Sequence, residues 1–129
     1  MGCPYEGEIN PQKVAEVSRT LFELGCYEVS LGDTTGMGTP EKTQRLFETL
    51  KKDFSGKPEV DKFAAHFHDT YDHALSNIFV ALENGVRVVD SSVGGIGGCP
   101  YAKKAAGNVC TENVVYALHE LGVQTGVDL

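Results

Sequence analysis

Residues 63–89 read FAAHFHDTYDHALSNIFVALENGVRVV, and this stretch decides the fold. It opens with the short apolar run FAAHF and closes with the apolar run VRVV. Between these runs, apolar residues recur at helical spacing from Ala74 to Leu82, and Asn84-Gly85 ends the segment. An apolar run, a helix and a second apolar run of these lengths predict a strand–helix–strand unit whose two strands are parallel.

The same alternation continues on both sides of this unit. Asn10-Pro11 and Thr39-Pro40 each place a proline after an N-cap residue, and Thr111 is expected to cap the last helix. The expected helices cover residues 11–24, about 41–54 and about 71–83, and a last helix begins at residue 111. The expected strands cover residues 26–31, 63–67 and 86–89. A helix followed by three strand–helix pairs predicts an α/β fold with a parallel sheet.

Two closures fit this order of elements: a small doubly wound sheet or part of a (β/α)8 TIM barrel. A whole barrel needs about 250 residues, and this chain has 129, so residues 1–129 would form about half of one. Half a barrel leaves strand edges unpaired and one sheet face uncovered. The inward-facing helical residues are expected to be Leu46, Phe47, Leu50, Phe54, Ala74, Leu75, Ile78, Phe79, Leu82, Val114, Val115, Leu118 and Leu121.

Charge and composition exclude several classes of protein. The formal net charge is −7, and the basic residues cluster no further than two lysine pairs, so no nucleic-acid partner is expected. No apolar run approaches the roughly 20 residues that span a bilayer, so no membrane partner is expected. The four cysteines have no CxxC spacing and are expected to be free thiols in a reducing, intracellular compartment.

Polar residues follow each expected strand. Asp33 ends the first strand segment, His66, His68 and Asp69 end the second, and Asp90 begins a polar run after the third. The carboxyl ends of parallel strands meet at one edge of the sheet, and α/β proteins build their sites there. The sequence therefore predicts a site at this edge.

His66 and His68 are the strongest candidates for metal ligands. Side chains at positions i and i+2 of a strand point to the same face, so both imidazoles should face one way and Phe67 the other. Two co-facial histidines suit a divalent cation, but their spacing fits zinc, manganese or iron equally well. Asp69 is expected to orient a ring or to approach the ion from behind its ligands.

A loop with four glycines, SVGGIGGCPYA, leads to Cys99 between Gly98 and Pro100. Such a loop can approach a ligand closely, and an exposed thiol can act as nucleophile, acid or base. The plainer interpretation is a linker with an incidental cysteine. Asn108, just before the last helix, offers an amide oxygen. The loop after Asp33 has neither phosphate-binding glycine pattern, so nucleotide binding is not supported.

Five segments together resemble a known family. They are CPYEG, GCYEVSLGDTTGMGTP, AAHFHDTYDHALSN, VVDSSVGGIGGCPYAKKAAGN and LGVQTGVDL. They closely resemble the C-terminal half of the 3-hydroxy-3-methylglutaryl-CoA lyases, which are metal-dependent lyases built on a TIM barrel. The resemblance covers essentially the whole chain, and only Ile96 departs from the cysteine-loop signature, where leucine is expected.

The resemblance implies a reaction and roles for site residues. The reaction is retro-Claisen cleavage of the acyl-CoA thioester substrate to acetyl-CoA and acetoacetate, in ketone-body formation and leucine degradation. His66, His68 and Asn108 match the family's ligands to a divalent cation, Mg²⁺ or Mn²⁺. Cys99 matches the loop cysteine that transfers a proton, and Asp33 matches an active-site aspartate. His66 thus counts as both metal-binding and catalytic.

The resemblance also implies what this chain lacks. The family's remaining metal-binding aspartate, its neighbouring arginine and a glutamate lie on early strands that have no counterpart here. We therefore expect the isolated chain to be inactive. The alternatives are a non-catalytic half-barrel that forms a homodimer or pairs with a missing half, and another metallolyase or Claisen-condensing synthase. The expected compartment is mitochondrial for a eukaryotic source and cytoplasmic for a bacterial one.

Overall fold

Three parallel strands form the centre of the structure, which is a computed structural model describing residues 2–3, 5–98 and 107–129. The strands are β3 (Val29–Asp33), β4 (Phe63–Phe67) and β5 (Val88–Asp90), with β4 in the middle. The helices are α1 (Pro11–Glu23), α2 (Pro40–Asp53), α3 (Ala74–Glu83) and α4 (Thr111–Glu120). Shorter elements are β1 (Gly2–Cys3), β2 (Gly7–Glu8) and the 3₁₀ turns η1 (Pro58–Asp61) and η2 (Val93–Gly95).

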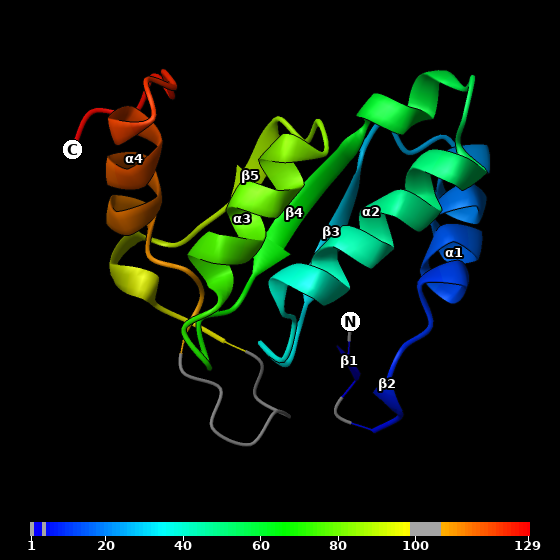
Figure 1. Cartoon of the computed structure of the whole chain (residues 1–129), viewed down its shortest axis with the longest axis horizontal. Helices are drawn as coiled ribbons and strands as arrows, with labels where there is room; N and C mark the ends of the chain where they lie inside the picture. The colour runs from blue at the N-terminus through cyan, green and yellow to red at the C-terminus, as the bar shows by residue number, and fades with distance from the viewer. Residues whose placement is uncertain (1, 4, 99–106) are drawn as a thin grey trace.

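Helices cover the sheet on the side that faces the viewer in Figure 1, where α2 and α3 lie in front of the strands. The α1 helix packs beside α2, and α4 lies at the opposite end of the molecule (Figure 1). The order of elements and the parallel pairing of β3 with β4 and of β4 with β5 confirm the α/β prediction.

The predicted caps of α1 and α2 are confirmed. The Asn10 side chain accepts a hydrogen bond from the Gln12 amide (2.9 Å), and the Thr39 hydroxyl accepts one from the Lys42 amide (3.3 Å). The predicted cap of α4 is wrong, because Cys110 occupies the N-cap position. The Thr111 hydroxyl instead shares a 2.8 Å hydrogen bond with the Ser91 hydroxyl.

The ends of the three strands lie within two residues of the predicted ends, except for the start of β3. The β3 strand begins three residues later than expected and extends to Asp33, because its pairing with β4 continues as far as Phe67. The β5 strand is displaced by the same pairing, which joins Ala64 to Val88 and His66 to Asp90. The helix α3 begins at Ala74, three residues later than predicted, after Asp72 with its positive φ of 57°.

The core lies between the sheet and the helices. Leu46, Phe47, Leu50 and Phe54 are all buried, as predicted for the second helix. The rings of Phe22, Phe54 and Phe63 pack edge to face, with centroids 5.3–5.7 Å apart, which is a favourable geometry for aromatic groups. The prediction for Leu121 is wrong: it lies one residue beyond α4 and is 62% exposed.

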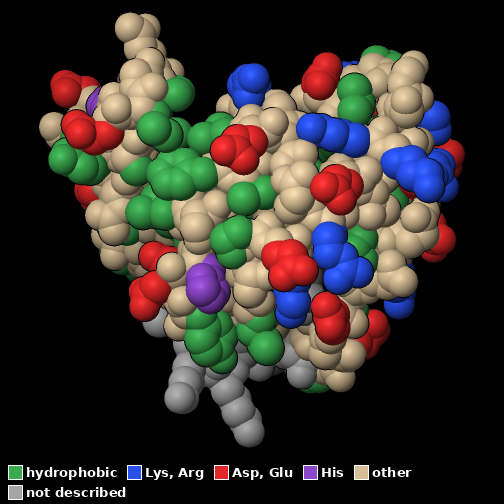
Figure 2. Space-filling view, viewed as in Figure 1, with side chains coloured by type: hydrophobic (Ala, Val, Ile, Leu, Met, Phe, Trp, Pro, Cys, Tyr) green, Lys and Arg blue, Asp and Glu red, His purple; other side chains and the backbone are tan. Residues whose placement is uncertain are grey.

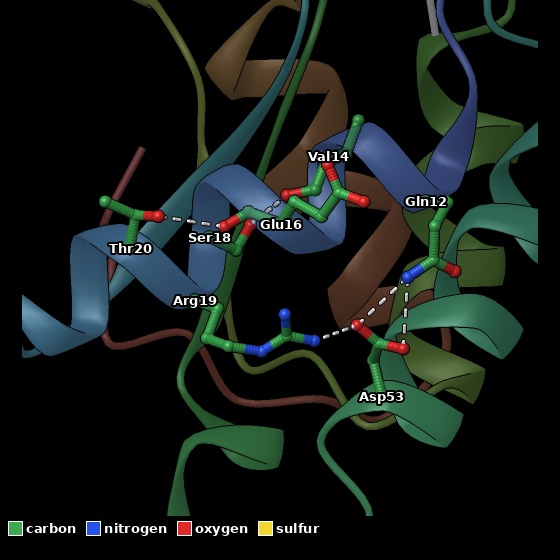
Figure 3. A network of polar contacts seen from close by, with 7 residues as sticks. All are labelled: Gln12, Val14, Glu16, Ser18, Arg19, Thr20 and Asp53. Atoms are coloured by element: carbon green, nitrogen blue, oxygen red, sulfur yellow. Dashed lines mark hydrogen bonds and ion pairs between the residues drawn. The ribbon is translucent and has the colours of Figure 1, made fainter.

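Asp53, the last residue of α2, ties that helix to α1. Its carboxylate accepts hydrogen bonds from the Gln12 side chain (3.2 and 3.3 Å) and pairs with the Arg19 guanidinium (Figure 3). Gln12 and Arg19 are seven residues apart and therefore lie on the same side of α1. These contacts join the last residue of α2 to two residues of α1.

Residues 107–111 contact the chain at the ends of both β4 and β5, a feature that the sequence did not predict. Cys110 pairs with Ser92 in a parallel bridge, and the Ser92 amide donates to the Val109 carbonyl (3.1 Å). On its other side, the Val109 amide donates to the Phe67 carbonyl (3.2 Å). This segment therefore lies against the carboxyl ends of β4 and β5.

The visible surface is divided by chemical character. Figure 2 shows hydrophobic side chains gathered toward the α4 side, whereas Lys, Arg, Asp and Glu side chains are interspersed over α1 and α2. Within the described part of the chain, none of the helices combines the length and apolar character needed to cross a membrane.

Candidate metal centre

The polar strand ends meet at one edge of the sheet, as predicted. The pairing register places Gly32, His66 and Asp90 side by side across β3, β4 and β5. This row lies one residue from the carboxyl end of β3 and β4 and at the end of β5. Three segments that are distant in sequence therefore contribute to a single site.

His66 and His68 lie next to each other, which confirms the predicted co-facial pair. Their ring centroids are 5.1 Å apart, while Phe67 between them is buried in the core on the opposite face. The His66 side chain is 35% exposed. His68 is buried, with 7% of its surface exposed.

The hydrogen bond of His68 determines which ring nitrogen can bind a ligand. Nδ1 lies 2.8 Å from the backbone carbonyl oxygen of Asp33. A carbonyl oxygen can only accept, so Nδ1 carries the proton and donates it. The other nitrogen, Nε2, then has a free lone pair in the neutral ring, which is the arrangement found in metal-binding histidines.

Asn108 faces His66. The Asn108 Nδ2 group donates to the Ile96 carbonyl (3.0 Å), and this orients its Oδ1 atom toward His66 Nε2, 3.1 Å away. A β-bridge to His68 and a hydrogen bond from the Asp69 amide to the Gly107 carbonyl (3.3 Å) hold this segment against the end of β4.

The residues present fit a divalent cation. In an octahedral site, each ligand atom lies about 2.1 Å from the ion, and two neighbouring ligand atoms at right angles are therefore about 3 Å apart. The separation of His66 Nε2 and Asn108 Oδ1, 3.1 Å, is close to this value. Among the described residues, no three His, Cys, Asp or Glu side chains gather closely enough to form a metal site. The side chains of His66, His68 and Asn108 are two imidazoles and one amide, which are groups that can bind a divalent cation.

Asp33 is placed differently from the histidines. It is fully buried and pairs with Phe67 in the sheet, so its side chain lies on the opposite face from His66. Its Oδ2 atom accepts a hydrogen bond from the Gly38 amide (2.8 Å), whereas no described group donates to Oδ1. Burial raises the pKa of Asp33, and the hydrogen bond from the Gly38 amide opposes this rise.

Asp69 does not act on a histidine ring as predicted. Its Oδ1 atom accepts a hydrogen bond from the Ala74 amide (3.1 Å), so it satisfies a free N–H at the start of α3. The short connection after β4 therefore uses this carboxylate to begin the helix.

Cys99 lies outside the described residues, but the N-terminal part of its loop is described. Glu112, in the first turn of α4, accepts hydrogen bonds from the Gly94 amide (3.0 and 3.2 Å) and from the Cys110 thiol (2.7 Å). The thiol, followed by the Glu112 and Gly94 amides, lowers the pKa of the Glu112 carboxyl. Sequence analysis missed Glu112, although an acidic residue after an expected cap was a usable signal.

The comparisons with known proteins agree with this geometry. A family model described as HMGL-like matches residues 1–129. The chain belongs to the HMGL-like family. The human cytoplasmic 3-hydroxy-3-methylglutaryl-CoA lyase is 55% identical over 129 residues, which are all of this chain and 34% of that protein. Relatives in the family carry names that place some in the cytoplasm and others in mitochondria.

Solved structures of the same family share the fold. The hydroxymethylglutaryl-CoA lyase of Pseudomonas aeruginosa is 52% identical, with a TM-score of 0.89 over 98% of this chain and 41% of that one. An HMG-CoA lyase from Acinetobacter baumannii, in complex with coenzyme A and 3-methylmalate, is 38% identical, with a TM-score of 0.87 over 99% of this chain and 41% of that one. This chain thus corresponds to part of a TIM barrel and spans less than half the length of these relatives.

Proposed function

We propose that this chain supplies the cation-binding part of a 3-hydroxy-3-methylglutaryl-CoA lyase. The observation that carries the proposal is the position of His66 Nε2 and Asn108 Oδ1, 3.1 Å apart, beside His68, in a chain 55% identical to such a lyase. A Claisen-condensing synthase is not favoured, because the matching relatives are lyases.

The substrate would be a CoA thioester with a tertiary hydroxyl group. A bound Mg²⁺ or Mn²⁺ supplies Lewis acidity, which lowers the pKa of that hydroxyl and neutralises the substrate carboxylate. His66, His68 and Asn108 would hold it. In the cleavage, the substrate hydroxyl would pass its proton to a carboxylate of the part of the barrel that this chain does not span and become the ketone of acetoacetate, while the C–C bond breaks and its electron pair forms the acetyl-CoA enolate.

Cys99 would act in proton transfer in this scheme, and Asp33 would be an active-site carboxyl. The thiol would donate a proton to the enolate carbon, which completes acetyl-CoA. Burial raises the pKa of Asp33, so its carboxyl would keep a proton to a higher pH than an exposed aspartate does. These roles, and a place in ketone-body formation and leucine degradation, belong to the proposal.

Binding of Mn²⁺ by the purified chain tests the cation site. His66→Ala should weaken binding at least tenfold, because it removes a direct ligand. His119→Ala is the matched control, since His119 is exposed on α4 and contacts Thr125 instead. Electron paramagnetic resonance of free Mn²⁺ measures both affinities. Equal binding by the two variants would refute the ligand assignment.

A further inference from the structure

Asp90, at the end of β5, lies beside the ring of His66 on the side away from Asn108. Its Oδ2 atom is 3.4 Å from His66 Nδ1. The same oxygen accepts a 2.8 Å hydrogen bond from the Ser30 hydroxyl on β3. The register places Ser30 beside Ala64 and Asp90 beside His66, so the contacts join all three strands on one face of the sheet.

The His66 ring therefore lies between two oxygen atoms that can accept a hydrogen bond but cannot donate one. Asn108 Oδ1 faces Nε2 at 3.1 Å, and the Asp90 carboxylate faces Nδ1. A neutral imidazole has one N–H, so it can donate to only one of these oxygens. If the proton sits on Nε2, that nitrogen has no lone pair for a cation. If it sits on Nδ1, Nε2 is free.

We propose that Asp90 is a positioning residue that keeps the proton of neutral His66 on Nδ1 and so leaves Nε2 as a cation ligand. The inference rests on the proposed cation site. His68 has the equivalent arrangement, in which the Asp33 carbonyl accepts from Nδ1. The Asn108 contact, at 3.1 Å, has the geometry of a hydrogen bond, whereas the Asp90 contact, at 3.4 Å, is an ion-pair distance. The negative charge of Asp90 nevertheless attracts the N–H more strongly than the neutral Asn108 oxygen does, and this favours the Nδ1–H form.

Ser30 holds Asp90 in place. Its hydroxyl donates to the carboxylate oxygen that faces the ring, and this limits rotation of the carboxylate away from His66. Asp90 and His66 are 45% and 35% exposed, so their pairing adds little to folding stability. The role of Asp90 is therefore expected to appear in the histidine and in cation binding.

Nitrogen-15 NMR of the imidazoles tests the inference without any metal. The full chain is measured at about pH 8.5, where an ordinary imidazole is neutral. Wild-type His66 should show mainly the Nδ1–H form. Asp90→Ala should shift it to the Nε2–H form, in which Asn108 accepts. Ser30→Ala should give a smaller shift in the same direction.

The His68 signals report whether each variant keeps its fold, because the Asp33 carbonyl fixes the Nδ1–H form there. Asp61→Ala, at an exposed residue of η1, is the control and should leave His66 unchanged. Asp90→Asn keeps the side-chain shape and serves if Asp90→Ala does not fold. It should give a mixture of the two forms, because the charge is lost.

Mn²⁺ titration of the same samples supplies a second measurement. Asp90→Ala should lower the affinity about tenfold, as expected for a group that orients a metal ligand. If the wild type binds Mn²⁺ and Asp90→Ala changes neither the proton position nor the affinity, the inference is overturned and the cation site stands. If the wild type binds no Mn²⁺ but His66 shifts as expected, the assignment to Asp90 is supported and the proposed function fails.

Discussion

Asp33 is a fully buried carboxyl with one oxygen that no described group satisfies. Such an arrangement opposes ionisation, because the charged form loses its hydration without gaining enough hydrogen bonds. A site that uses the group for chemistry can tolerate this cost, since other parts of the protein supply the stability. The consequence can be measured as a dependence of stability on pH.

We expect Asp33→Asn to be more stable relative to the wild type at pH 7 than at pH 4. The pKa of Asp33 is higher in the folded chain than in the unfolded chain, where it is about 3.9. As the pH rises from the unfolded-state pKa through the folded-state pKa, ionisation of Asp33 therefore lowers the stability of the folded chain. The substitution removes this loss. Urea unfolding of both proteins from pH 4 to 7 measures it.

Exposed Asp61, replaced by asparagine, controls for a general effect of charge and should show no such trend. If Asp33→Asn and the wild type keep a constant difference over this range, burial does not hold the pKa of Asp33 above its ordinary value.

Gly36 lies where the loop after β3 passes closest to the end of β4. Its φ is +67°, and a Cβ atom there would be 2.6 Å from the Thr70 hydroxyl oxygen and 3.2 Å from the His68 carbonyl oxygen. Gly56 has a similar φ of +73° but open space around it. The pair separates the cost of the backbone angle from the cost of the close contact.

Gly56→Ala should lower the free energy of unfolding by about 1 kcal/mol, from the backbone angle alone. Gly36→Ala should lower it by about 2–4 kcal/mol, because crowding adds to the angle. Urea denaturation measures both values. Equal losses would show that Thr70 moves aside without cost.

At the scale of elements, a buried polar contact joins three segments. Asn77 on α3 is fully buried, its Nδ2 donates to the Gly38 carbonyl (2.9 Å), and its Oδ1 accepts from the Thr43 hydroxyl on α2 (3.1 Å). The Gly38 amide in turn donates to Asp33. These contacts therefore join α2 and α3 to the loop whose Gly38 amide donates to the Asp33 carboxylate.

Asn77→Ala should lower the free energy of unfolding by about 2–3 kcal/mol, because it removes the donor to a buried carbonyl. Thermal and urea unfolding provide the measurement. Asn113→Ala, at an exposed position of α4, should change stability by less than about 0.5 kcal/mol. A loss for Asn77→Ala no larger than for Asn113→Ala would mean that water replaces the amide.

At the scale of the whole molecule, this chain aligns with 34% of the human lyase and 41% of the Pseudomonas aeruginosa lyase. Of the described strands, β3 pairs on one side only, with β4. A strand edge left open is prone to pair with another segment. We propose that the missing part of the barrel, or a second copy of this chain, covers it.

The isolated chain should not cleave 3-hydroxy-3-methylglutaryl-CoA in the presence of Mn²⁺. Co-expression with the preceding part of the Pseudomonas aeruginosa lyase should restore cleavage, because that part would supply the remaining ligands and strand partners. Acetoacetate formation measures activity, and light scattering measures assembly. Turnover by the chain alone would refute the expectation that the site is incomplete. A well-folded monomer would exclude a homodimer.

Much of the fold, and the meeting of the polar strand ends at one edge of the sheet, could be predicted from the sequence. Apolar spacing located α1 to α4 and all three parallel strands, and the caps of α1 and α2 follow from Asn10 and Thr39. The positions of Asp33, His66 and His68 at the ends of expected strands also predicted that these residues would lie at the same edge of the sheet. These properties are local, because they depend on the alternation of side chains and on the hydrogen-bonding groups of neighbouring residues.

Only the tertiary structure decided which atoms meet. Strand pairing moved the boundaries of β3 and β5, because register depends on the partner strand and not on local apolar content. The register of β4 with β5 placed Asp90 next to Nδ1 of His66. The bridge between His68 and Asn108 brought Asn108, from 42 residues away, next to Nε2 of His66. The register of β3 with β4 turned the Asp33 carboxylate away from His66 and its carbonyl oxygen toward His68. Sequence spacing contains no such information, since these contacts arise from how separate strands align.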